Sequence, residues 1–339
     1  MNNPSARLKA GPVDMHSHMT PRDFPAGPAG EARWPCMQHT SATTGTVMMG
    51  DKPFRQLDNR SWDRRKRMED MDRDGVSVHA LSPMPELLSY WFGPDSATAM
   101  CDLMNQDIAD HCAAEPSRFA GLGMVPMQDP ALAVKHLERV KNVYGLSGIE
   151  VGSNINGKYL GDRSFDPVWE AAESLGLAVY AHALHPLATE GHDLPMVLTN
   201  AAGFPIDTAM TVASMLANDT IGRFPNLRIG FSHGGGAVAP IVHRLDWVWN
   251  LGGGMAESMP NRPRDMAAKM YFDSNVYDTA YLKHLCEHLA PGHIFLGTDY
   301  PYVIEQTDPV GYAKRADLDK DQLDSLLFGA AHEFLHHHH

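Results

Sequence analysis

Two histidines, His16 and His18, stand near the start of the sequence in the run VDMHSH. In an extended strand the side chains of residues i and i+2 leave the same face roughly 6–7 Å apart, so two imidazoles there can bind one ion. Histidine is the commonest neutral metal ligand, and a reactive metal site needs further nitrogen or oxygen ligands from elsewhere in the fold. Two solvated histidines at a strand end would look the same in sequence. The rest of the chain therefore has to supply the remaining ligands.

Three more polar residues end apolar segments: His182 closes 177–182, His233 closes 227–233 and Asp299 closes 294–299. Such short apolar runs are typical of buried parallel strands. The carboxyl ends of parallel strands in a barrel line one mouth, where active sites are built. Any one of these histidines has an ordinary interpretation as a hydrogen-bonded core residue. Their joint placement at strand ends, together with the first pair, favours a metal and proton-transfer site.

Eight such strand candidates alternate with helix-length segments, which predicts parallel strand–helix–strand units and, for eight of them, an α/β fold of the TIM-barrel type. A doubly wound open sheet is the alternative, but no Gly-rich dinucleotide fingerprint follows the first strand. We expect one domain over 1–335, with an insertion at about 19–60 over the barrel mouth. The expected strands are 12–17, 75–82, 118–125, 147–152, 177–182, 227–233, 269–275 and 294–299, and the expected helices are 63–73, 95–114, 130–143, 165–175, 206–218, 238–250 and 279–289.

Composition indicates a soluble globular protein: 339 residues, 43% hydrophobic and 20% charged, can bury a large core. No apolar run approaches the ~20 residues that a membrane span requires, so we expect no membrane partner and a cytoplasmic location. The net charge of −13 argues against nucleic acid, and we interpret the one basic run, 64–67, as a solvated helix face. The four cysteines lack zinc-knuckle or disulfide spacing, and His336 to His339 look like a purification tag.

Four segments carry a resemblance to a known family: 13–18 (VDMHSH), 44–55 (TGTVMMGDKPFR), 231–236 (FSHGGG) and 296–301 (LGTDYP). They resemble aminocarboxymuconate-semialdehyde decarboxylase, in the decarboxylase branch of the amidohydrolase superfamily. The resemblance covers nearly the whole chain. It implies a TIM barrel with one divalent metal ion, zinc with manganese as the alternative, and a small carboxylate as substrate.

The resemblance also implies roles for individual residues. His233 would be the general base that activates the metal-bound water, Arg55 would face a substrate carboxylate, and Asp299 or water could return a proton to carbon. Three imidazoles and one carboxylate leave a divalent ion with net positive charge and room for water, whose pKa a zinc ion can lower to about 7. The four implied metal ligands are His16, His18, His182 and Asp299.

The chain departs from the family at three places. It reads His182-Ala-Leu-His185-Pro where the family reads His-Pro-Trp-Asp, which leaves His185 as an alternative ligand or a pocket residue. The family's pocket tryptophan is absent before Phe204, and the place of the family's second carboxylate-binding arginine falls near Gly252 in the glycine run 252–254, so one anion contact is lost. A monocarboxylate, or a ring with hydroxyl or amino groups, therefore fits better than a dicarboxylate. Arg244 matches an arginine donated across a dimer interface, so the resemblance implies a homodimer.

Two further motifs have two interpretations each. The glycines at 234–236 could form a phosphate loop, but no Walker lysine follows, and we prefer the interpretation that they make room beside the metal. The aromatic-rich loop at 89–92, which includes Trp91, either packs as a lid or stacks on a planar substrate.

Two classes of enzyme are compatible with these residues. The first is a metal-dependent, non-oxidative decarboxylase of a small aromatic or muconate-type acid, and the second is a hydrolase of an amide, ester, lactone or C–C bond. Arg55, as an anion-binding group beside the ion, favours the decarboxylase. A zinc-stabilised binding protein is disfavoured, because structural sites are closed by four ligands and rarely lie at a barrel mouth.

Overall fold

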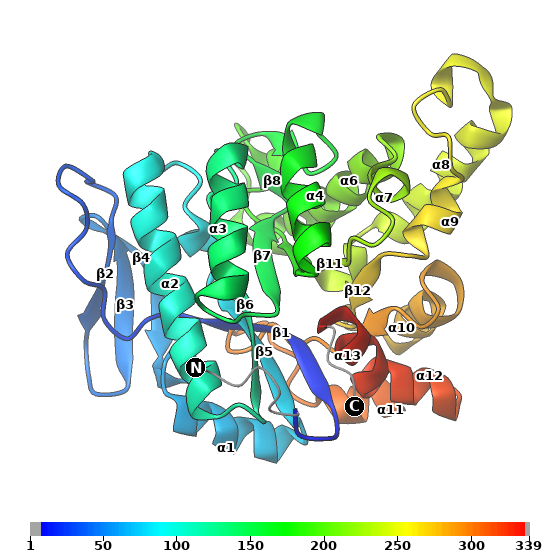
Figure 1. Ribbon diagram of the computed structural model, residues 1–339. Helices are drawn as coiled ribbons and strands as arrows, with labels where there is room; N and C mark the ends of the chain where they lie inside the picture. The colour runs from blue at the N-terminus through cyan, green and yellow to red at the C-terminus, as the bar shows by residue number, and fades with distance from the viewer. Residues whose placement is uncertain (1–7, 336–339) are drawn as a thin grey trace.

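A computed structural model of the protein describes residues 8–335 (Figure 1). Its centre is an eight-stranded sheet in which every neighbouring pair is parallel. Backbone hydrogen bonds from Met15 N to Leu296 O (2.8 Å) and from Asp299 N to His16 O (2.9 Å) join the last strand segment to the first. The sheet therefore closes into the predicted TIM barrel. In sheet order, which is also chain order, the strands are β1 (Val13–Met19), β5 (Val78–Pro83), β6 (Phe119–Gly123), β7 (Gly148–Gly152), β10 (Ala178–His182), β11 (Ile229–Phe231), β12 (Tyr271–Asp273) and β13 (Ile294–Phe295).

Helices follow the strands and surround the barrel (Figure 1). The first helix shows why they begin and end where they do. The Asp63 carboxylate accepts hydrogen bonds from the first free backbone N–H groups, and Gly75 ends the helix at φ 73°, a left-handed conformation that suits glycine. The helices are α1 (Arg64–Asp74), α2 (Pro94–Ala114), α3 (Pro130–Asn142), α4 (Asp166–Leu175), α5 (Met196–Leu198), α6 (Phe204–Ala217), α7 (Thr220–Arg223), α8 (Val238–Leu251), α9 (Pro263–Ala267), α10 (Thr279–His284), α11 (Pro309–Lys314), α12 (Lys320–Asp324) and α13 (Ala330–Leu335).

Most of the expected strands are shorter than predicted, and in two of them this changes where a site residue lies. β11 ends at Phe231 and β13 at Phe295, so His233 and Asp299 lie in the loops that follow rather than at the last ladder positions. Both residues have left-handed backbones, with φ of 54° and 68°, which an extended strand does not allow. The expected helix at 279–289 likewise divides into α10 and a π-helical turn, Leu285–Leu289.

The insertion after β1 is more regular than its composition suggests. It contains a three-stranded antiparallel sheet, β2 (Pro35–His39), β3 (Thr44–Met49) and β4 (Lys52–Asp58), at the left of Figure 1. The outer strands β2 and β4 are mostly exposed, so they lack the apolar alternation by which a strand is recognised in sequence. A short hairpin, β8 (Asn154–Ile155) and β9 (Lys158–Tyr159), follows β7.

The barrel interior is filled by an apolar cluster at the end away from the candidate site. Val13 and Met15 of β1 pack there with Phe334 of α13. A β-bulge between Asp14 and Ser17 interrupts the alternation of β1. It allows the next side chains, His16 and His18, to face inward as well.

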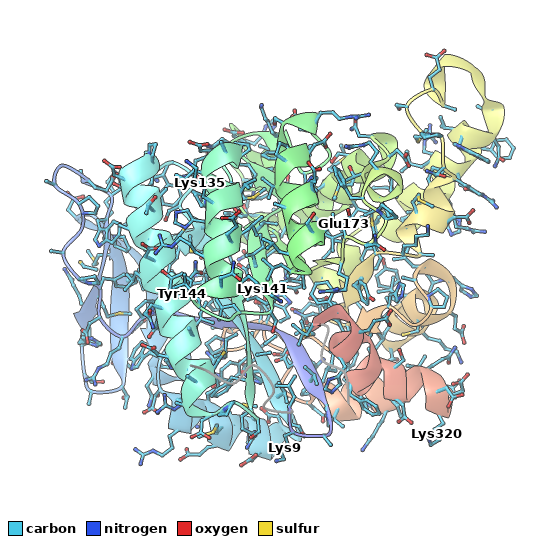
Figure 2. The ribbon with its side chains drawn as sticks, in the orientation of Figure 1. Lys9, Lys135, Lys141, Tyr144, Glu173 and Lys320 are labelled. Atoms are coloured by element: carbon cyan, nitrogen blue, oxygen red, sulfur yellow. The ribbon has the colours of Figure 1, made fainter. Side chains whose placement is uncertain are left out.

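Lysine side chains lie on the outer faces of α3 and α12. Figure 2 labels Lys135 and Lys141 on α3 and Lys320 on α12, and all three side chains are exposed. Within residues 8–335 no helix has the length and apolar character that crossing a membrane requires. The predicted tag at 336–339 lies outside the described residues.

The interpretation of the basic run 64–67 as a solvated face is wrong for one residue. Arg67 is only 2% exposed. Its Nη2 donates hydrogen bonds to the backbone oxygens of His18 (2.5 Å) and Arg60 (3.1 Å). The guanidinium therefore supports the backbone of β1. The charges near Arg67 in the sequence give no sign of this contact, because the acceptor is a distant backbone oxygen.

Candidate metal centre and active site

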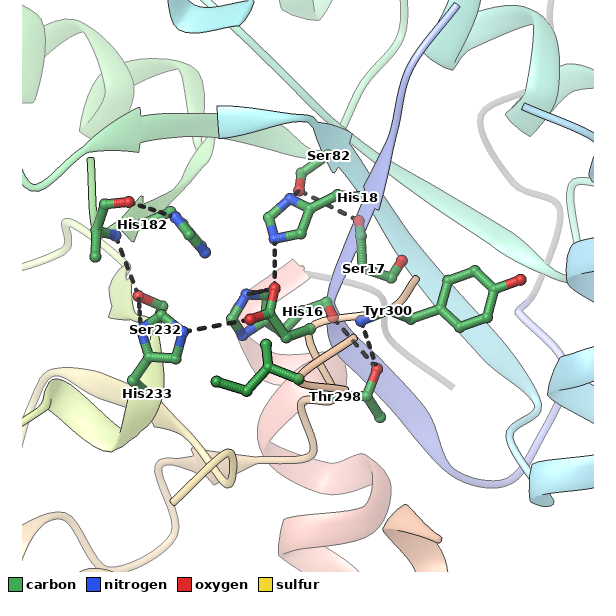
Figure 3. A network of polar contacts seen from close by, with 12 residues as sticks. His16, Ser17, His18, Ser82, His182, Ser232, His233, Thr298 and Tyr300 are labelled. Carbon is green, nitrogen blue, oxygen red and sulfur yellow. Dashed lines mark hydrogen bonds and ion pairs between the residues drawn. The ribbon is translucent and has the colours of Figure 1, made fainter. Parts of the chain in front are cut away.

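The polar residues predicted from strand ends converge inside the barrel mouth. Ligand atoms of four buried side chains lie within 4.8 Å of one another: His16, His18, His182 and Asp299. We call these four residues the metal cluster. The Nε2 atoms of His16 and His18 each lie 3.3 Å from Asp299 Oδ1. Figure 3 shows the imidazoles of His16, His18 and His182 in this region, with His233 beside them.

The burial and the missing hydrogen bonds of the ligand atoms show that the cluster fits a divalent metal ion. The three Nε2 atoms and Asp299 Oδ1 are buried, and none has a hydrogen-bond partner among the residues that the structure describes. A buried polar atom left unpaired costs roughly 1–3 kcal/mol, so four of them facing one point indicate a shared partner. Three imidazoles and a carboxylate form a donor set that zinc and other divalent ions use.

Each imidazole is held from behind through its other ring nitrogen. His16 Nδ1 lies 2.6 Å from Asp273 Oδ2, and the Nδ1 atoms of His18 and His182 lie 3.0 Å and 2.8 Å from backbone carbonyl oxygens. An acceptor at Nδ1 fixes the hydrogen on that atom and leaves the lone pair on Nε2. All three rings therefore present their free nitrogen to the same point.

Asp273, the last residue of β12, is a site residue that the sequence analysis missed. Besides His16, it binds the Tyr180 hydroxyl (2.9 Å) and the backbone N–H groups of Gly234 (2.8 Å) and Asn275 (3.1 Å). Burial alone would raise the pKa of Asp273, but its bond to His16 and the nearby imidazoles hold that pKa below its usual range. Its place at the end of an apolar strand is the same signal that identified the other residues.

The charges of Asp299 and His182 suit metal binding, because a metal ligand must be an ionised carboxylate or a neutral imidazole. Burial opposes ionisation of Asp299, but the neighbouring His16 and His18 hold the pKa of its carboxyl well below the usual value. Desolvation, with the adjacent imidazoles, lowers the pKa of His182 well below its usual value, which keeps that ring neutral. Burial disfavours the charged forms of His16 and His18, but the carboxylates of Asp299 and Glu150 raise the pKa of these rings, so a metal ion competes with protons for them.

His233 lies beside the metal cluster without being one of its four members. Its Nε2 is 3.6 Å from Asp299 Oδ2, and its Nδ1 is 3.1 Å from the Ser232 hydroxyl. The side chain is 13% exposed, unlike the fully enclosed rings of the cluster. This position allows the Nε2 atom to exchange a proton with a group bound at the cluster.

The glycines after His233 make room for close packing. A Cβ atom on Gly236 would stand 1.9 Å from the backbone oxygen of Pro205. The N–H group of Gly234 is already bound to Asp273, so it is not available to a phosphate. These contacts disfavour a phosphate loop, and the room that Gly236 provides is taken by the backbone of Pro205.

Arg55 reaches the site from β4 and is held by two residues that the sequence analysis missed. Its Nη2 donates to Glu86 Oε1 (2.9 Å), and its guanidinium carbon lies 4.6 Å from the centre of the Tyr302 ring. Tyr302 in turn stacks on His18, with ring centres 5.3 Å apart and planes at 27°. The Tyr302 ring therefore lies between Arg55 and His18 of the metal cluster.

His185 and Trp91 lie in a neighbouring pocket of about 550 Å³, whose lining also includes Arg33, Tyr90 and Asn154. The rings of Trp91 and His185 meet edge to face with centres 5.9 Å apart. The structure thus brings His182, and not His185, into the metal cluster. Arg244 is exposed on α8, so within one chain it is separate from the buried cluster.

A closed parallel barrel with a buried His/Asp metal site at one mouth defines a class of metal-dependent barrel proteins. The chain belongs to the amidohydrolase family, whose sequence profile matches residues 13–336. This confirms the family expected from the four sequence segments.

Comparison with individual proteins narrows the branch. Over 329 residues the chain is 33% identical to the 2-amino-3-carboxymuconate-6-semialdehyde decarboxylase of Dictyostelium discoideum, which covers 95% of this chain and 91% of that protein. The structure is similar to that of the 5-carboxyvanillate decarboxylase LigW from Sphingomonas paucimobilis, with a TM-score of 0.77, 26% identity and coverage of 98% and 99%. A 5-carboxyvanillate decarboxylase from Novosphingobium aromaticivorans, whose structure holds manganese, has the same fold, with a TM-score of 0.72, 22% identity and 82% coverage of each chain.

Proposed function

We propose that this protein is a metal-dependent, non-oxidative decarboxylase of a small aromatic or muconate-type carboxylic acid. The observation that carries the proposal is the convergence of four unpartnered ligand atoms beside Arg55, an anion-binding side chain. The relatives named above, which are decarboxylases, support the reaction type.

In this proposal His16, His18, His182 and Asp299 hold the ion, which is zinc, with manganese as the alternative. The bound ion supplies a Lewis acid that polarises an oxygen atom at the site. His185 has no ligand role, because its ring lies against Trp91 in the neighbouring pocket.

The protein's own side chains would orient the acid and move the proton. Loss of CO2 leaves an electron pair on carbon, which must receive a proton. His233, whose Nε2 lies 3.6 Å from Asp299 Oδ2, is the proposed general base and proton carrier, with Asp299 as the alternative proton source. Arg55 would bind the substrate carboxylate through N–H groups that Glu86 does not use, and Trp91 would pack against the planar substrate.

We further propose a cytoplasmic homodimer of a single-domain chain, in which the insertion at 19–60 lies over the mouth and Arg244 reaches the partner's site. Supporting this, α8 carries exposed apolar side chains next to Arg244, including Trp247 at 68% and Leu251 at 59% exposure. Apolar groups gathered on one surface are typical of an interaction site. Light scattering tests the dimer, and a monomer that is active at assay concentration would reject the shared site.

The reaction is tested by incubating the metal-loaded protein with a panel of hydroxy- and amino-substituted aromatic acids and muconic acids, without redox cofactor. We expect CO2 release, and we expect Arg55→Ala to raise KM or lower kcat by about tenfold, as for the loss of a charge-assisted hydrogen bond. Hydrolysis of esters, lactones or amides with no CO2 from any acid would instead establish the hydrolase.

A further inference from the structure

Glu86 is a mostly buried carboxylate whose second oxygen has no hydrogen-bond partner among residues 8–335. It lies in a short helical turn, Pro85–Leu88, directly after β5, and its side chain is 13% exposed. Oε1 accepts the hydrogen bond from Arg55, whereas Oε2 is buried and accepts none from any described residue. Burying an acceptor without a donor is costly, so a donor is expected to arrive with a ligand.

Glu86 lies between the metal cluster and the pocket. On one side it holds Arg55, which packs on Tyr302 and through it on His18. On the other side, the chain continues from the turn that carries Glu86 into Tyr90 and Trp91, two residues that line the pocket. A planar acid that spans the cluster and the pocket would therefore pass this carboxylate.

We propose that Glu86 selects the substrate by accepting a hydrogen bond from a hydroxyl or amino group on its ring. This rests on the proposed function and names its substrate class, a hydroxy- or amino-substituted aromatic monoacid. Oε2 gains its missing donor from such a group. A second carboxylate at the same place would be repelled by the charge of Glu86 instead.

The substitution Glu86→Gln reverses this preference. The Gln amide oxygen will turn toward Arg55, because Arg55 is a donor, and the amide NH2 will then replace Oε2. The ring substituent will face a donor instead of an acceptor. Affinity for hydroxy and amino acids should fall, while affinity for the matching methoxy acids and dicarboxylic acids should rise.

The closing experiment measures binding of matched hydroxy, amino, methoxy and carboxy-substituted benzoic acids by calorimetry, alongside CO2 release, with the metal-loaded protein. We expect the hydroxy-to-methoxy affinity ratio to fall at least tenfold in Glu86→Gln. Glu305→Gln is the matched control: Glu305 Oε1 pairs with Arg60 Nη1 at 2.8 Å, its side chain is 12% exposed and its Oε2 is also unpartnered. Its substitution removes the same charge and should leave the ratio unchanged.

Each result has a separate meaning. An unchanged ratio in Glu86→Gln, an equal fall in Glu305→Gln, or a wild-type protein that binds none of these acids would overturn the role of Glu86. Binding whose preference changes with Glu86, but without CO2 from any acid, would support that role and reject the proposed decarboxylase.

Discussion

The metal cluster and the neighbouring pocket are built in opposite ways. The cluster side chains are buried, come from the strands or the loops directly after them, and are fixed from behind, as His16 is by Asp273. The pocket is lined from the insertion and from loops, with Arg33, Trp91 and an exposed His185. Side chains on strands are held more rigidly than side chains on loops. In the proposed function the barrel would position the groups for chemistry, and the loops would select the acid.

The largest effects should follow from damage to the cluster. We expect His16→Ala and Asp299→Ala to remove most of the bound metal and, with it, turnover, because each deletes one of four converging ligands. Elemental analysis of the purified variants and restoration of the chelated wild type with zinc or manganese measure this. Full metal occupancy in both variants would refute the ligand assignment.

Substitution of His233 should have a smaller effect, because it should impair proton transfer without removing the metal ion. His233→Ala should retain the metal, because His233 is not one of the four converging residues. Its turnover should fall by a factor on the order of 10² or more, as when a general base is removed. Turnover close to that of the wild type would contradict the role of His233.

The cluster was predictable from sequence, and the pocket was predictable only in part, through His185 and Trp91. His16, His18, His182 and Asp299 lie in the apolar strands or just after them, and a barrel brings such positions together whatever their distance along the chain. Glu86 lies in a short helical turn and Tyr302 in a loop, so no periodicity marks their partnership with Arg55. The burial of Arg67 was missed for a related reason: its acceptor, the backbone oxygen of His18, is supplied by tertiary structure alone.

The support behind the cluster offers a milder perturbation. Asp273→Asn keeps the shape of the side chain but weakens its hold on His16, and loss of such an orienting partner typically lowers metal affinity by roughly 10–100-fold. Competition with a metal indicator measures this affinity. Asp246→Asn is the control, because Asp246 is also buried but pairs with Arg262, away from the cluster. An equal loss of affinity in both variants would show a general effect on folding.

The most direct test compares two histidines three positions apart in the chain. His182 lies in the cluster and His185 lies against Trp91 in the pocket, so the two alanine variants make equal chemical changes in the two regions. We expect His182→Ala to lose most of its metal and His185→Ala to keep the full complement while its KM changes. Metal content measured on both purified variants shows which of the two histidines is the metal ligand. Loss of metal from His185→Ala with full retention in His182→Ala would contradict the account.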